Sequence, residues 1–285
     1  MPVLQLTWDQ AGWLSGVLVI AGFVASRSDS TRARTLGPFV REAAVIAALY
    51  TLWQLAGTLA EHGTAGGLAR GRWIARTERG WHLPSEQSLQ GPLLEHRSLG
   101  YLANLYYAGM HFPGLIVLLF WVFWRHRAHY RRLRAVVIGF TTLSLLIQLV
   151  PVAPPRLVPQ LGFTDVAAHY GQSVYALGGL SADELSAVPS VHVGWAVLVG
   201  LYPVLIGTSR WRWLTLLHPV ATVYVVVATA NHWWFDGLVS IALLAAVVLV
   251  VRVWTGGSAE DRPAQTPAAV EADSTSPAAS CAPTF

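Results

Sequence analysis

Long apolar runs separated by short polar segments dominate the chain. A helix needs about 20 mostly apolar residues to cross the hydrocarbon core of a bilayer. Seven runs approach this length, and we expect each to form a transmembrane helix: residues 8–25, 43–60, 105–124, 135–152, 191–206, 214–230 and 235–254. Several contain proline or glycine, which transmembrane helices tolerate better than soluble helices do. The pattern predicts an all-α fold, a polytopic transmembrane helical bundle.

The polar segments divide the chain into one transmembrane domain and a tail. From Gly256 onward small, polar and acidic residues and proline replace the large apolar ones, so this part cannot bury a core. We therefore expect a transmembrane catalytic domain over residues 1–255 and a disordered tail over residues 256–285. The long loop 61–104 interleaves tryptophan and leucine with polar residues, which predicts short interfacial helices.

Composition agrees with a membrane location and narrows the chemistry. Hydrophobic residues make up 54% of the chain and charged residues 12%, which is unusual for a soluble domain. All 19 basic residues are arginines, so a phosphate would be bound by guanidinium and a Schiff-base lysine is excluded. The single cysteine, Cys281, excludes an intramolecular disulfide and a thiolate metal cluster. The net charge of +4 comes with arginines that flank apolar runs, which does not favour nucleic-acid binding.

The arginines of the short loops predict the orientation. Three short polar segments are rich in arginine, namely residues 26–42, 125–134 and 207–213. Such loops favour the cytoplasm, which places the C-terminus inside and the loops 61–104, 153–189 and 231–234 outside. The loop 61–104 also contains arginines, but its length and its glutamates weaken its effect. We expect a multi-pass protein of the cell membrane.

Two of the outer segments contain candidate phosphate-binding groups. Pro-Val-Ala-Pro-Pro-Arg, residues 151–156, places Arg156 at the interface, where a guanidinium suits a phosphate or serves as a plain anchor. Val-Pro-Ser-Val-His, residues 188–192, opens an apolar run with a helix-start signal, and a helix N-terminus attracts an anion. Ser190 and His192 would lie beside that anion, although a histidine at this depth can also be an ordinary interfacial residue.

The third outer segment, Asn-His-Trp-Trp-Phe-Asp, contains His232 and Asp236. If a helix begins at Asn231, these two residues are four apart and share a face. The carboxylate can then hold one ring nitrogen and leave the other free, as in an oriented nucleophile or base. An intramembrane aspartate without a partner would be costly. The predicted topology brings Arg156, Ser190, His192, His232 and Asp236 to one membrane face.

The order Pro-Pro-Arg, Pro-Ser-x-His and His-x-x-x-Asp resembles the type 2 phosphatidic acid phosphatase superfamily over roughly residues 100–250. Together with Asn104-Leu-Tyr-Tyr and His111-Phe-Pro, these motifs look most like the branch of inositol phosphorylceramide synthases and their bacterial relatives. The chain departs from the phosphatase pattern, since it lacks a lysine ahead of Arg156 and has Val225 and Val226 where that pattern has Ser-Arg. The departures favour the synthase-like branch.

The resemblance implies a six-helix core with an extra N-terminal span and a metal-free mechanism without a cofactor. In it, His232 would form a phosphohistidine, Asp236 would orient it, and His192 would act as acid and base. Arg156 and Ser190 would bind the phosphoryl oxygens. The substrate would be a lipid phosphate, and the acceptor would be water or an alcohol such as inositol or a sugar. Tyr106, Tyr107 and His111 could line an acceptor pocket, although interfacial aromatic packing also explains the tyrosines.

Three other interpretations remain open from the sequence. A simple lipid-phosphate or polyprenyl-diphosphate phosphatase would use the same residues with water as acceptor. A zinc-dependent membrane hydrolase could use two histidines and an aspartate, but the chain lacks a His-Glu-x-x-His motif. A non-catalytic transporter or channel would be expected to place charged residues deep in its spans, whereas here they lie near the ends.

Overall fold

The computed structural model describes residues 7–62, 64–172 and 185–256. These residues are mainly helical and include no β-strand beyond an isolated bridge between Val152 and Ser186. The helices are α1 Trp8–Arg27, α2 Thr31–His62, α3 Thr64–Gly80, α4 Glu86–Glu95, α5 Arg97–Gly109, α6 His111–Arg125, α7 Arg127–Gln148, α8 Val166–His169, α10 Val191–Ile206, α11 Leu217–Ala228 and α12 Trp234–Gly256. Short 3-10 turns are η1 Pro155–Leu157, η2 Pro159–Leu161 and η3 Arg210–Leu216.

The expected all-α membrane bundle is confirmed. Among the described residues, four helices are long and apolar enough to cross a membrane: Trp8–Arg27, Thr31–Ala56, Arg210–Ala228 and Trp234–Thr255. The pair α5 and α6 makes a fifth if it is one span bent by 48°, so the expected run 105–124 is broken near Met110. The helix α10, with 16 residues, is shorter, and α7 begins with several arginines; their crossing stays a prediction.

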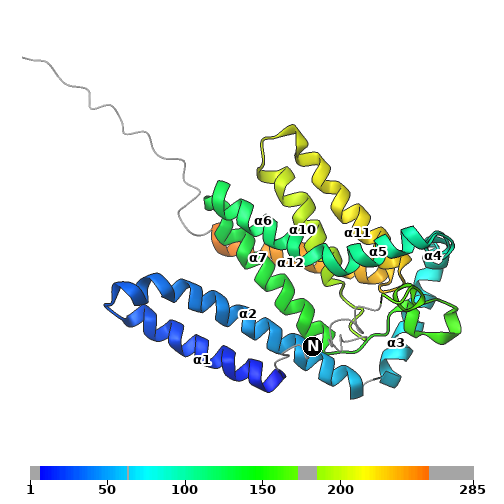
Figure 1. Ribbon diagram of the computed structural model, residues 1–285, viewed down its shortest axis with the longest axis horizontal. Helices are drawn as coiled ribbons and strands as arrows, with labels where there is room; N and C mark the ends of the chain where they lie inside the picture. The colour runs from blue at the N-terminus through cyan, green and yellow to red at the C-terminus, as the bar shows by residue number, and fades with distance from the viewer. Residues whose placement is uncertain (1–6, 63, 173–184, 257–285) are drawn as a thin grey trace, which may run out of the picture.

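The N-terminal helices α1 and α2 form an antiparallel pair beside the remaining helices (Figure 1). The helix α1 packs along α2, and α2 packs against α7. Ser15 ties the pair together, because its hydroxyl donates to the carbonyl of Ala44 at 3.2 Å. The pair meets the other helices through α2, and the division into a six-helix core and one extra N-terminal span stays a prediction.

Four helices, α6, α7, α10 and α12, pack around a shared apolar core. Phe140 of α7 is fully buried in it. A Cβ atom at Gly194 of α10 would lie 2.0 Å from the Phe140 ring, so only glycine allows this close approach of the two helices. Gly194 comes two residues after His192, and this packing fixes the start of α10 against the bundle.

The two ends of the bundle differ in character. At one end Arg134 pairs with Glu42 at 2.6 Å, and Arg132 donates to the Thr255 hydroxyl at 3.2 Å. At the other end, α3 and the segments 151–158, 185–188 and 231–234 meet around the buried Trp233. The prediction of short helices within the loop 61–104 is confirmed, because α3 and α4 lie in it. The predicted disordered tail lies outside the described residues, apart from Gly256, which ends α12.

Candidate active site

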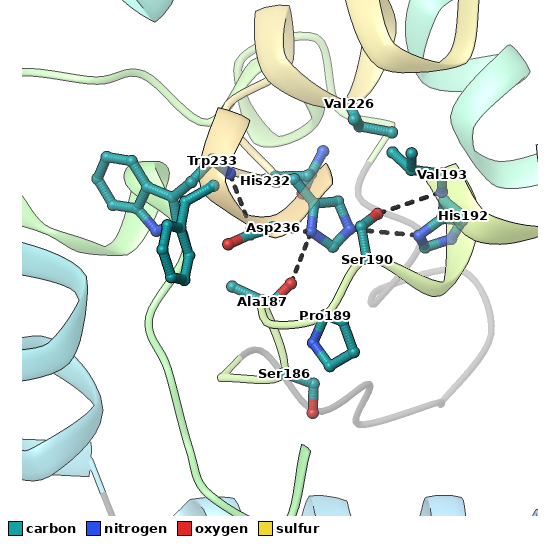
Figure 2. Close-up of polar contacts among 12 residues, drawn as sticks. Ser186, Ala187, Pro189, Ser190, His192, Val193, Val226, His232, Trp233 and Asp236 are labelled. Atoms are coloured by element: carbon teal, nitrogen blue, oxygen red, sulfur yellow. Dashed lines mark hydrogen bonds and ion pairs between the residues drawn. The ribbon is translucent and has the colours of Figure 1, made fainter. Parts of the chain in front are cut away.

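His232 lies at the end of the bundle where these segments meet, and its ring is held on one side. Its Nδ1 atom is 2.9 Å from the carbonyl oxygen of Ala187 and 3.2 Å from Asp236 Oδ2 (Figure 2). Because a carbonyl oxygen only accepts, Nδ1 carries the proton and donates it. The other ring nitrogen, Nε2, therefore has the lone pair. It faces His192 Nδ1 at 3.3 Å.

The backbone that places this dyad differs from the expected one. The helix α12 begins at Trp234 and not at Asn231, so His232 precedes the helix and Asp236 lies in its first turn. Asp236 Oδ2 accepts the N–H of Trp233 at 2.8 Å, as a carboxylate at a helix N-terminus readily does. Asp236 is fully buried, and its Oδ1 atom has no hydrogen-bond partner among the described residues.

A tight turn after α11 delivers His232 to the site. The N–H groups of Asn231 and His232 both donate to the carbonyl of Val226, at 3.1 and 3.0 Å. Ala230 has φ of 56°, a left-handed conformation that is uncommon for a residue other than glycine and is found mostly at turns and functional sites. Val226, which stands where the phosphatase pattern has arginine, is thus a backbone anchor with a buried side chain.

Ser190 and His192 open α10 as the sequence predicts. Ser190 is the N-cap, and its hydroxyl accepts the N–H of Val193 at 3.3 Å. Its own N–H donates to the carbonyl of Asp236 at 3.4 Å, which links the start of α10 to the start of α12. His192 lies in the first turn and points its Nδ1 toward His232 (Figure 2). Since His232 Nε2 is an acceptor, His192 Nδ1 is the donor in this contact.

Arg156 is buried next to the turn that carries His232. Its side chain is 3% exposed, and its Nε atom donates to Asn231 Oδ1 at 2.9 Å. One terminal nitrogen lies 3.4 Å from Asp165 Oδ2, and the backbone N–H donates to the carbonyl of Ala230 at 3.1 Å. Asn231 and Asp165 therefore hold the guanidinium beside the dyad, and neither was singled out from the sequence as a site residue.

Aromatic and histidine rings also pack against His192, in addition to its contact with His232. The ring centroids of Tyr107 and His111 lie 4.6 and 4.7 Å from that of His192. Tyr106 lies behind them, 5.6 Å from His111, and its hydroxyl is 2.6 Å from Nδ1 of His218. The three residues expected at an acceptor pocket are therefore close together and next to His192. His218 joins them from α11, and no motif in the sequence had marked it.

A family model described as the PAP2 superfamily, the type 2 phosphatidic acid phosphatases, matches residues 72–250. The chain belongs to this superfamily. The match covers α4 to α11, the second half of α3 and most of α12, so every residue of the dyad and its surroundings lies within it. Comparison with curated proteins and with solved structures gave no match. PAP2 membership and the apolar helices together support a phosphatase-type enzyme in a membrane, with a lipid phosphate as a plausible substrate.

The zinc-hydrolase interpretation requires histidine and carboxylate side chains that are placed to bind a metal ion. No group of three or more histidine, cysteine, aspartate or glutamate residues is placed to hold a metal ion within the part of the chain that the structure describes. Asp236 directs Oδ2 to a histidine and to a backbone N–H. This is the arrangement of an orienting carboxylate.

Proposed function

We propose that this PAP2 protein transfers a phospho group from a lipid to an alcohol through a phosphohistidine on His232. The observation that supports this most directly is the fixed His232 ring. Nδ1 is bound to Ala187 and Asp236, while Nε2 faces the proton donor of His192 at 3.3 Å. A nucleophile beside a base or acid and held by a third group is the arrangement that nucleophilic catalysis requires.

The reaction has two balanced steps. In the first, His232 Nε2 attacks phosphorus, the P–N bond forms, and the P–O bond to the leaving group breaks while His192 gives that oxygen a proton. In the second, His192 takes the proton of the incoming hydroxyl, whose oxygen attacks phosphorus and breaks the P–N bond. The first step places positive charge on the His232 ring and the second removes it, and the buried Asp236 carboxylate stabilises the charged intermediate.

Arg156 and the start of α10 would bind the phosphoryl oxygens. The contact from Arg156 to Asp165 is long, at 3.4 Å, so a phosphoryl oxygen can replace it at little cost. Ser190 caps the helix whose first-turn N–H groups favour an anion. Charge on the equatorial oxygens is the main feature that a phosphoryl-transfer site must stabilise.

The ring cluster next to His192 favours transfer over simple hydrolysis. His111 is 4% exposed, and its Nδ1 atom donates to the carbonyl of Tyr107 at 3.1 Å. Its Nε2 atom is therefore an acceptor, and it has no hydrogen-bond partner among the described residues. A buried acceptor of this kind suits a hydroxyl of the incoming alcohol. We infer that Tyr106, Tyr107, His111 and His218 line the acceptor side, as in a synthase-like branch.

We place the active site at the extracytoplasmic face and the C-terminus in the cytoplasm. The arginine-rich segments belong to the end of the bundle opposite the dyad, where Arg132 contacts Thr255 near the end of α12. The positive-inside tendency of such segments supports this orientation.

The purified protein in detergent or vesicles tests the proposal directly. We expect labelled lipid phosphate to give a phosphohistidine and, with inositol or a sugar present, a labelled phospho-alcohol. A panel of polyprenyl, phosphatidyl and ceramide donors would identify the lipid. Release of inorganic phosphate alone, whatever alcohol is added, would instead support a lipid-phosphate phosphatase, and lack of any turnover would support a transporter.

His111→Phe should reduce transfer more than phosphoenzyme formation. The substitution keeps a ring against His192 and removes the Nε2 acceptor, so the acceptor alcohol loses one hydrogen bond in a buried site. Such a loss costs about 1–3 kcal/mol, so we expect the ratio of transfer to hydrolysis to fall by about 5- to 150-fold. His129→Phe, an exposed position at the other end of the bundle, is the control. An unchanged ratio would remove His111 from the acceptor side.

A further inference from the structure

Glu78 of α3 reaches the first turn of α12. Its Oε1 atom accepts the N–H of Phe235 at 2.6 Å, across 157 residues of sequence. The side chain is 4% exposed, so it is removed from solvent at the end of the bundle that contains the dyad. Phe235 immediately precedes Asp236, and the bonded N–H is one of those left unpaired at a helix start. Glu78 therefore caps the turn that carries the orienting carboxylate.

Other residues of α3 and of the segment that follows it also contact the first turn of α12. The indole N–H of Trp234 donates to the carbonyl of Pro84 at 2.9 Å. The ring of Phe235 lies edge-on to Trp73, with centroids 5.9 Å apart, and 6.1 Å from Trp81. The segment from α3 to the start of α4 thus fixes Trp234 and Phe235. Because Asp236 follows Phe235 directly, this segment helps to hold Asp236 at its place beside His232.

A second carboxyl group faces Glu78. Glu86 of α4 lies within hydrogen-bond reach of it. If both groups were ionised, Glu78 Oε2 and Glu86 Oε1 would be buried acceptors without a donor. One shared proton supplies the donor. In agreement, burial raises the pKa of Glu78 well above its usual value, and Glu86 raises it further, while the Phe235 N–H opposes the shift. Asp236 on α12 adds a third negative charge and acts in the same direction.

We propose that Glu78 is a positioning residue for the phosphoryl transfer, a neutral carboxyl that shares a proton with Glu86 and holds the first turn of α12, so that Asp236 faces His232. It does not touch the substrate, and its role rests on the proposed function. A neutral cap binds the Phe235 N–H without placing another full charge beside Asp236. Loss of the proton would set Glu78 against both Glu86 and Asp236 and would loosen the turn.

The comparison of Glu78→Ala with Glu78→Gln tests the proposal. Glutamine keeps an oxygen that accepts the Phe235 N–H and is neutral, whereas alanine removes the cap. With labelled lipid phosphate, we expect Glu78→Ala to lower kcat by about tenfold with little change in KM, because a misplaced dyad slows chemistry more than binding. Glu78→Gln should restore most of the rate near neutral pH. Glu95→Gln, an exposed glutamate at the end of α4, is the matched control.

The pH profile separates positioning from a purely structural role. A carboxyl with a raised pKa stays protonated at neutral pH and ionises as the pH rises, so wild-type kcat should fall on the alkaline side. In Glu78→Gln this alkaline limb should move to higher pH. If Glu78→Gln keeps the wild-type limb, or Glu78→Ala keeps the wild-type kcat, the positioning role is wrong. If Glu78→Ala does not fold, the glutamine profile still decides. Absence of labelled enzyme in the wild type would instead overturn the proposed function.

Discussion

Replacing His232 by alanine is expected to abolish the labelling of the enzyme by a labelled lipid phosphate. Nε2 of His232 faces His192 at 3.3 Å, while the other nitrogen is bound to Ala187 and Asp236. Without Nε2 there is no nucleophile to form the P–N bond, so we expect turnover to fall by at least about 10³-fold. The labelled species should be acid-labile and alkali-stable, as phosphohistidine is.

Two further variants separate chemistry from folding. His232→Asn replaces the ring by an amide that can still donate to Ala187 and Asp236 but has no atom at the position of Nε2, so it should fold and remain unlabelled. His192→Ala keeps the nucleophile and removes the proton donor, so it should label slowly and release the label slowly. Labelling of His232→Asn at the wild-type rate would place the nucleophile elsewhere, and His129→Ala serves as the control for an unrelated histidine.

The sequence predicted which side chains lie close together better than it predicted the backbone that joins them. The four-residue spacing of His232 and Asp236 suggested a helical face, yet the helix begins only at Trp234. The contact forms all the same, because Asp236 caps the first turn through Trp233 N–H and the turn after α11 carries His232 back over it. A short spacing in sequence limits how far two side chains can separate, whichever conformation joins them.

The helical runs were predictable for a simple physical reason. In a bilayer the backbone must satisfy its own hydrogen bonds, and a single long apolar run does so by forming an α-helix. The break at Met110 was not predicted, because the apolar composition continues through it from α5 into α6. The break has a consequence for the site: it starts α6 at His111, whose ring bonds the Tyr107 carbonyl and packs against His192.

The residues missed from the sequence depend on contacts between distant segments. Glu78 and Phe235 are 157 positions apart, and Tyr106 and His218 are 112 apart. Glu78 sits among several charged residues of one loop, and nothing in that pattern distinguishes it from Glu95. Asp165 is similar, since it follows a loop without a motif and meets Arg156 only once η1 and η2 have turned the chain. Burial identifies Glu78, and the contact with the buried Arg156 identifies Asp165; both signals require the fold.

Replacing Asp236 by asparagine should reduce turnover strongly while leaving the fold intact. Asparagine has nearly the same shape, and its oxygen can still accept the N–H of Trp233, now 2.8 Å from Oδ2. What is lost is the negative charge that stabilises a positively charged His232 ring and fixes its proton on Nδ1. Loss of an orienting carboxylate in a comparable triad costs about 10⁴-fold in kcat, and we expect a fall of about 10²–10⁴-fold here.

Stability should respond differently from activity in this variant. Asp236 is fully buried, and its Oδ1 atom has no hydrogen-bond partner among the described residues, so removing the charge also removes an unfavourable burial. We therefore expect Tm to stay within a few degrees of the wild type. Single-turnover labelling should show the loss in the first chemical step, with donor KM little changed. Asp9→Asn, at the exposed start of α1, is the control. A wild-type labelling rate in Asp236→Asn would mean that the Ala187 carbonyl alone orients His232, and a large fall in Tm would mean that Asp236 is needed for packing.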